Sequence, residues 1–190
     1  MPLALLLDGI PEYARDLKAN LSAVLAQPEL SAQQAWGTAV SCAVASKSPR
    51  LTEAVAAEAA QHIGERAVSA AKTAAAIMGM TNIYYRFSHL TSNPKYGEMP
   101  ARLRMQSLRS HGVEALDFEL WCLAVSAINA CQGCVEGHER SLRESGVGEE
   151  KILAAVRIAA VVFALAAVME SEASLPKPPA SAPQASALAK

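Results

Sequence analysis

The sequence predicts an all-α fold, and three observations support that prediction. Of the 190 residues, 52% are hydrophobic and only 18% are charged, and much of the apolar content is alanine, the strongest helix former. Apolar side chains recur at helical spacing along most of the chain, and no segment shows a convincing strand pattern. Glycine and proline number ten each, too few for a collagen-like or turn-rich β architecture. We therefore expect closely packed helices around one sizeable core.

Two helices are predicted near the N-terminus. Pro11 suits the first turn of a helix over residues 11–26. The apolar residues of this segment share one helix face: Tyr13, Leu17, Leu21, Val24 and Leu25. Ser31, with Gln34 three residues later, matches a capping box and predicts a second helix that runs to about Lys47. The proline at position 49 disfavours helix at the residue before it, so this helix is expected to stop there.

The middle of the chain is predicted to hold two helices, a turn and a short helix. The two helices span residues 52–64 and 65–80, and the second is alanine-rich and expected to be buried. Most turn signals of this region fall within residues 91–100. A short helix over residues 100–110 is expected to follow.

Three more helices are predicted over residues 117–129, 131–144 and 148–172, with Asp117 capping the first. Beyond Ala173 the composition changes to proline, alanine and serine, which is typical of a disordered tail. We therefore expect a single helical domain over residues 1–173 and a tail over 174–190.

An internal duplication is indicated by two clusters of identity. Residues 36–41 match 121–126, and residues 63–71 match 147–155, both at an offset of roughly 85. This pattern favours a duplicated three-helix unit, with chance similarity in an alanine-rich chain as the competing explanation. At this offset Cys131 and Cys134 stand opposite Ser46 and Pro49, so chemistry is expected in the second copy only.

Charge and hydropathy exclude several classes of protein. The 17 Lys and Arg residues balance 18 Asp and Glu residues, and no basic patch is visible, so nucleic-acid binding is not expected. The longest apolar run, residues 158–169, is too short to span a bilayer and is predicted to be a buried core helix. The run at residues 3–7 has no basic segment before it and does not match a signal peptide. We expect a cytoplasmic protein without membrane association.

The strongest candidate site is Cys131-Gln132-Gly133-Cys134 followed by His138, with Glu119 upstream. An N-cap at Asn129 would place both cysteines in the first turn of a helix, where free N–H groups and the helix dipole stabilise a thiolate. Spacings of three and four residues put both cysteines and His138 on one helix face. The pair can close a disulfide, His138 can move a proton, and Glu119 can orient that imidazole.

Two interpretations of this cluster remain open from the residues alone. One is a redox-active dithiol, and the other is a metal-binding or redox-sensing adaptor in which Glu119 is the fourth zinc ligand, although structural zinc sites prefer more thiolates. Cys42 and Cys122 lie among alanine and valine and are expected to be buried packing residues.

The other candidates are weaker. His62 and His111 are expected at the surface or at helix ends. His89 lies beside the aromatic residues 84–87, which suit either a ligand-binding wall or, more commonly, a core cluster. Met78 and Met80 are interpreted as packing residues.

Glu119, eleven intervening residues, the CxxC motif and His138 four residues later resemble the active-site signature of the alkyl hydroperoxidase AhpD family, within the carboxymuconolactone-decarboxylase-like superfamily. Segments 11–18, 76–86 and 118–129 also resemble that family, so the similarity covers about residues 10–172. A decarboxylase of the same superfamily is a further alternative, but that chemistry has no evident need for paired thiols.

The resemblance implies an all-α fold with an internal repeat, usually assembled as a homotrimer. It implies a thiol peroxidase that reduces alkyl hydroperoxides, binds no cofactor or metal, and is re-reduced by a dihydrolipoyl group on a carrier protein; some members also recycle a partner peroxiredoxin. Carried over, Cys134 is the attacking and more buried thiolate. Cys131 is then the more exposed resolving thiol that meets the reductant, and Glu119 with His138 forms the proton relay.

One residue departs from the family pattern. Members often carry histidine directly before the second cysteine, where this chain has Gly133. Its absence removes a proton-handling group, so we expect either lower activity or reliance on the Glu119–His138 pair. Glycine here also loosens the first helical turn.

Overall fold

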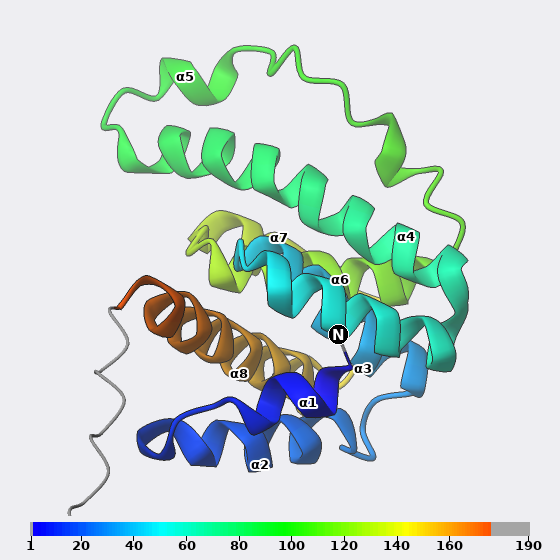
Figure 1. Cartoon of the computed structure of the whole chain (residues 1–190). Helices are drawn as coiled ribbons and strands as arrows, with labels where there is room; N and C mark the ends of the chain where they lie inside the picture. The colour runs from blue at the N-terminus through cyan, green and yellow to red at the C-terminus, as the bar shows by residue number, and fades with distance from the viewer. Residues whose placement is uncertain (1, 176–190) are drawn as a thin grey trace, which may run out of the picture.

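The computed structural model describes residues 2–175, and every regular element within them is a helix (Figure 1). The α-helices are α1 (Leu3–Asp8), α2 (Arg15–Leu25), α3 (Ala32–Ala45), α4 (Pro49–Leu90), α5 (Lys95–Glu98), α6 (Ala115–Ile128), α7 (Gln132–Glu144) and α8 (Glu149–Ser174). Two short 3-10 helices span Glu12–Ala14 and Gln106–Leu108. The all-α prediction is confirmed. Ser174, the first residue of the predicted tail, is the last residue of α8, and residues 176–190 of that tail lie outside the described residues.

Helices α3 and α6 form the centre of the fold. Helix α3 is buried without interruption from Gly37 to Ala43, and α6 from Leu120 to Ser126. Helix α4 packs against both from one side, and α8 packs against both from the other (Figure 1). Small residues permit this close approach: a Cβ atom on Gly37 would lie 2.1 Å from Cζ2 of the fully buried Trp121. The indole ring therefore lies directly on the backbone of α3.

Helix α8 is, by length and composition, the one helix within residues 2–175 that could cross a membrane. Half of its most apolar stretch is nevertheless buried against the rest of the protein, and core helices of soluble proteins meet the same criteria. Six of its nine buried residues fall within the apolar run expected to be core: Ile158, Ala159, Val162, Leu165, Ala166 and Met169. This confirms that the run belongs to a core helix.

The predicted capping box at the start of α3 is present. Ser31 Oγ accepts a hydrogen bond from the Gln34 backbone N–H at 3.2 Å, and Gln34 Oε1 accepts one from the Ser31 N–H at 3.1 Å. Both donors are among those that a helix start leaves unpaired.

Helices 52–64 and 65–80 form a single long element, α4, which is kinked at Gly64 (φ 75°, ψ 159°). Helix α4 begins earlier than expected because Ser48 is its N-cap and Pro49 occupies its first turn. The Ser48 Oγ atom accepts a hydrogen bond from the Leu51 N–H. The helix ends at Leu90 rather than near Met80, because the polar residues after that point pack against α6 and remain helical.

Two other predicted boundaries are wrong, and one helix was not predicted. Within 11–26, a 3-10 turn precedes α2, and Tyr13 is 70% exposed rather than on the apolar face. Within 100–110 only Gln106–Leu108 is helical, and Arg102 has a positive φ of 52°. The apolar run at residues 3–7 was expected only not to be a signal peptide. It forms helix α1, which packs against α4.

Asp117 does not cap α6, which begins two residues earlier with Glu114 at the N-cap. The Asp117 carboxylate instead accepts hydrogen bonds from Gln33 Nε2 at 2.6 Å and Gln34 Nε2 at 2.8 Å. It therefore joins the beginnings of α3 and α6, a contact between segments that are distant in the sequence.

The duplicated three-helix unit is visible in the order of the elements. Helix α3 and the two halves of α4 correspond to α6, α7 and α8, and the kink at Gly64 corresponds to Gly148 at the N-cap of α8. Each first helix ends in a turn whose last residue before the next N-cap has a positive φ, Lys47 (57°) in one copy and Ala130 (51°) in the other.

This correspondence corrects the predicted pairing of residues between the copies. Because Ser48 and Cys131 each follow the positive-φ residue and each form an N-cap, Cys131 stands opposite Ser48 rather than Ser46, and Cys134 opposite Leu51 rather than Pro49. The offset of 85 that aligns Trp36 with Trp121 does not hold at this junction. The stretch from Trp121 to the end of α6 is shorter than the equivalent stretch of α3, so the residues after it pair at a smaller offset.

Each junction is held by the last helix of the other copy. Ser48 Oγ donates to Glu170 Oε1 of α8 at 2.6 Å, and Arg86 of α4 donates through Nη1 to the Asn129 carbonyl at 2.6 Å. We refer to these two contacts as the cross-repeat clamps. They fix where α4 and α7 begin, and the second of them positions the candidate site.

Candidate active site

Cys131 and Cys134 form a disulfide bond at the beginning of α7, with their Cα atoms 5.3 Å apart. Cys131 is the N-cap, and Cys134 lies in the first turn of the helix. The tight turn at Ala130 lets the Cys131 N–H donate to the Ser126 carbonyl at 3.2 Å. The predicted position at a helix N-terminus is confirmed, but Asn129 is the C-cap of α6 rather than the N-cap of α7.

The two sulfur-bearing residues differ in exposure, in the opposite sense to the expectation. Cys131 is fully buried, whereas Cys134 is partly exposed. Cys131 is the N-cap directly after the positive-φ turn at Ala130, and Cys134 lies within the first turn of α7. Cys134 is therefore the residue of the pair that a solvent molecule can reach.

Glu119 and His138 meet as predicted. The Nδ1 atom of His138 lies 2.9 Å from Glu119 Oε1, across the contact between α6 and α7. A carboxylate oxygen accepts, so Nδ1 is the donor and Nε2 faces the other way, 3.3 Å from the Met78 sulfur. With only 18% of the His138 side chain exposed, this pair is well shielded from water.

Cys134 and His138 line a cavity of about 340 Å³ between α4, α7 and the segment after α5. Most of its other lining is apolar or uncharged: Met78, Thr81, Asn82, Tyr85, His89, Met105, Leu108, Gly133 and Gly137. Such a chamber suits a small apolar molecule that must approach the Cys134 sulfur.

A buried polar network fixes the wall of this cavity. Asn82 Nδ2 donates to Ser126 Oγ at 3.0 Å, and Asn129 Nδ2 donates to Asn82 Oδ1 at 2.9 Å. The network ties α4 to the α6–α7 junction next to the disulfide. Asn82 is not among the predicted site residues. An amide in an alanine-rich helix expected to be buried is nevertheless a usable signal, because such a group needs hydrogen-bond partners.

Of the other three histidines, one lines the cavity and two lie outside it. His62 stacks on Trp36 and His111 on Phe118, with ring centroids 4.6 and 4.1 Å apart, and neither lines the cavity. His89 and Tyr85 do line it. The ligand-wall interpretation of this segment is therefore the better one, since Phe87 is 52% exposed and no core cluster forms.

Cys42 and Cys122 are buried packing residues, as expected. Burial raises the pKa of the Cys42 thiol to about 12, and burial also raises the pKa of the Cys122 thiol far above its ordinary value, with the nearby Glu119 charge adding to the effect. Both remain protonated at neutral pH and are poor nucleophiles.

We therefore expect Cys42 and Cys122 to resist alkylation in the folded, reduced protein. Iodoacetamide at pH 7.5 should modify neither thiol over a period that is enough to modify Cys134, because only the thiolate reacts and both thiols are shielded. Mass spectrometry of peptides, with a sample alkylated in denaturant as the control, checks this. Rapid native labelling of Cys42 would contradict it.

The disulfide form is not arranged to hold zinc, and the zinc alternative for the reduced thiols stays a prediction. Within residues 2–175 no group of three or more His, Cys, Asp or Glu side chains is arranged to hold a metal ion. Both thiols of the motif are joined in the disulfide, and His138 is turned towards a thioether and a carboxylate.

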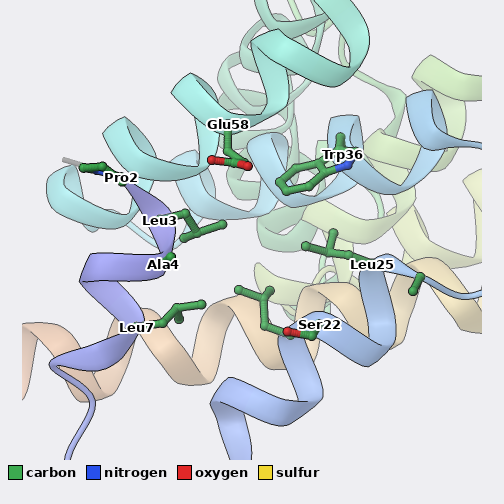
Figure 2. A pocket seen from close by; sticks show the side chains of 10 residues that line it. Pro2, Leu3, Ala4, Leu7, Ser22, Leu25, Trp36 and Glu58 are labelled. Carbon is green, nitrogen blue, oxygen red and sulfur yellow. The ribbon is translucent and has the colours of Figure 1, made fainter.

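A second hollow, of about 410 Å³, lies between α1, α2 and the start of α4 (Figure 2). It is lined mainly by apolar residues such as Leu3, Leu7, Leu25 and Trp36, with the Glu58 carboxylate at one side. None of the four predicted site residues lines it, whereas Cys134 and His138 line the cavity described above.

Comparison with known proteins shows which proteins this chain is similar to. The Carboxymuconolactone decarboxylase family matches residues 94–174, which include all four site residues. A protein of Solibacter usitatus named alkyl hydroperoxide reductase AhpD is 60% identical over 173 residues, covering 91% of this chain and 98% of that relative. Proteins with the same name from Acidobacterium capsulatum and Koribacter versatilis are 53% and 54% identical, covering 90% of this chain and 94% and 89% of the respective relatives.

Proposed function

Because the chain belongs to the AhpD family of alkyl hydroperoxide reductases, we propose that it reduces organic hydroperoxides through a dithiol–disulfide cycle at Cys131 and Cys134. The observation that carries this proposal is the position of Cys134, which closes a disulfide at a helix N-terminus and also lines an apolar cavity shared with His138. A hydroperoxide with an alkyl group fits the uncharged lining of that cavity.

In the oxidative half of the cycle, the Cys134 thiolate attacks the terminal oxygen of the hydroperoxide. The O–O bond breaks, an S–O bond forms, and the alkoxide leaves and takes a proton to become the alcohol. The Cys131 thiol then attacks the sulfenic sulfur, the disulfide closes, and water leaves. Free N–H groups at the start of α7 and the helix dipole stabilise the negative charge on sulfur.

The Glu119–His138 pair is the proton relay in this scheme. Hydrogen bonding of Nδ1–H to the carboxylate fixes the ring orientation and leaves Nε2 as the unprotonated nitrogen of the neutral ring. In the oxidised structure Nε2 contacts the Met78 sulfur. When the disulfide opens, the freed Cys134 thiol lies one helical turn before His138 on α7 and lines the same cavity, so this imidazole is in position to exchange a proton with it.

For the reductive half, we propose that a dihydrolipoyl group on a carrier protein attacks the disulfide at Cys134. An external thiol reaches the partly exposed residue first, and the buried Cys131 is then the leaving thiolate. The largely apolar cavity suits a flexible alkyl dithiol arm. A partner peroxiredoxin that is recycled by this protein, and a cytoplasmic location, belong to the same proposal.

We also propose a homotrimeric assembly. Large apolar side chains remain exposed on the outer surface of α8, where Leu153 is 51% and Phe163 is 50% exposed. Burial of this surface between copies removes it from water.

The deciding experiment measures hydroperoxide consumption by the reduced protein with dihydrolipoamide or dithiothreitol as reductant. We expect turnover with either dithiol, faster with dihydrolipoamide at equal concentration, and none in the Cys131→Ser/Cys134→Ser double variant. Turnover by the double variant would refute the dithiol cycle. Stoichiometric zinc that resists a chelator in the freshly purified protein would instead support the metal-binding alternative.

Loss of the relay should slow the reaction without unfolding the protein. We expect His138→Ala to lower the second-order rate constant for cumene hydroperoxide by about 10²-fold, within the usual range for a lost acid–base group. Glu119→Gln keeps the hydrogen-bonding shape but removes the charge, so a smaller loss is expected. Stopped-flow kinetics measures both, with Glu139→Gln on the same helix as the control.

A further inference from the structure

The imidazole of His89 occupies the space next to Gly133, the residue directly before Cys134. A Cβ atom built on Gly133 would lie 2.7 Å from both Cε1 and Nε2 of His89. Real Cβ atoms do not approach other heavy atoms so closely, so the ring lies where the side chain of residue 133 would otherwise begin. Glycine at this position leaves room for a ring that reaches over from the end of α4.

The hydrogen bonding of His89 determines the protonation of the ring nitrogen that lies next to Gly133. Its Nδ1 atom lies 2.6 Å from the Tyr85 carbonyl oxygen, one turn earlier on α4. A carbonyl only accepts, so Nδ1 carries the proton. In the neutral ring Nε2 is therefore the unprotonated nitrogen, and Nε2 is one of the two atoms that lie against Gly133.

His89 and His138 serve different parts of the same cavity. Both line it together with Cys134, but His138 is shielded and held by Glu119, whereas His89 is exposed near the end of α4. Tyr85 is the only other titratable side chain in the lining, and Met105 and Leu108 contribute only apolar surface. In the adjoining hollow, His89 is accompanied by Tyr84, Tyr85 and Tyr96. No carboxylate lines either space.

We propose that His89 is a second proton-transfer group of this active site, acting on Cys134 from the open side of the cavity. The inference rests on the proposed peroxidase function and extends it. His89 Nε2 takes the proton of the Cys134 thiol, and the thiolate attacks the terminal peroxide oxygen. As the O–O bond breaks, the same Nε2–H returns the proton to the alkoxide, which leaves as the alcohol, and the hydroperoxide hydrogen remains on the sulfenic acid. The proton-handling group that residue 133 lacks is thus supplied by another helix.

The test compares His89→Ala with the wild type in hydroperoxide consumption at pH 7. We expect the second-order rate constant to fall by about tenfold or more, with added imidazole restoring part of it because the vacated site is open to solvent. We also expect Gly133→His to restore activity in the His89→Ala background, because it places an imidazole in the same volume. His62→Ala, which removes a histidine outside the cavity, is the matched control and should leave the rate unchanged.

A second measurement separates this inference from the proposed function. Iodoacetamide alkylation of Cys134 in the reduced protein reports thiolate formation without any peroxide, and His89→Ala should slow it at pH 7. If the wild type consumes no hydroperoxide but His89→Ala still slows alkylation, the proposed function fails while the role of His89 stands. If the wild type is active and His89→Ala matches it in both assays, the inference about His89 is overturned. Rate loss in His89→Ala that neither imidazole nor Gly133→His reverses also overturns it, since that result indicates a structural effect.

Discussion

Replacement of Cys134 by serine is expected to reduce hydroperoxide consumption by at least about 10³-fold, because the hydroxyl is a far weaker nucleophile than a thiolate and no neighbouring group can replace it. Cys131 cannot substitute, since it is fully buried and does not line the cavity. Loss of the partly exposed sulfur therefore removes both the point of attack and one half of the disulfide.

The serine variants of the two cysteines should lose activity in different ways. Cys131→Ser keeps the attacking thiol but cannot close the disulfide, so we expect rapid consumption of one equivalent of hydroperoxide followed by arrest. Cys134→Ser should show no rapid phase. Stopped-flow absorbance, with dimedone trapping of the sulfenic acid, distinguishes the two variants, and Cys42→Ala is the control for loss of an unrelated buried thiol. A full burst in Cys134→Ser and none in Cys131→Ser would reverse the assigned roles.

The largest effect on stability is expected at Trp121. This side chain is fully buried between α3 and α6, and its ring lies against the backbone of Gly37. Trp121→Ala should lower the free energy of unfolding by about 3–5 kcal/mol, the usual cost of removing a large aromatic side chain from a core. Urea titration followed by circular dichroism measures this loss.

Gly37→Ala tests the same contact from the opposite helix. The added Cβ would lie 2.1 Å from the indole ring, so we expect a loss of about 1–3 kcal/mol from overpacking. In the Trp121→Ala background the same substitution has room and gains helix propensity, so its effect should vanish or become stabilising. Additive effects of the two substitutions would show that the contact does not govern packing here.

Features that depend on nearby residues could be predicted from the sequence. Ser31 and Gln34 form their capping box because both partners lie within one helical turn. The CxxC spacing places Cys131 and Cys134 close enough for a disulfide in any helix start. The pairing of Glu119 with His138 followed from a motif in which both residues recur at fixed spacing.

Features that depend on contacts between distant segments could not be predicted. Asp117 is a residue type that often caps helices, but its carboxylate accepts hydrogen bonds from two glutamines of α3. Only the packed fold brings those glutamines near Asp117. The relative exposure of the two cysteines depends on the positive φ of Ala130, a conformation that alanine rarely adopts and that no local pattern indicates. His89 was identified only as a neighbour of aromatic residues, because the space over Gly133 belongs to another helix.

The cross-repeat clamps have a consequence for any attempt to divide the chain. Glu170 of the second copy holds the junction of the first copy, and Arg86 of the first copy holds the junction of the second. Each half of the chain therefore provides the hydrogen bond that holds the turn of the other half. A half-length polypeptide of this design would have to associate with another half before its own turn was held. Joining the two halves in one chain meets that requirement within a single molecule. Only one of the two equivalent turns then has to carry the cysteines, and the turn at Ser48 does not.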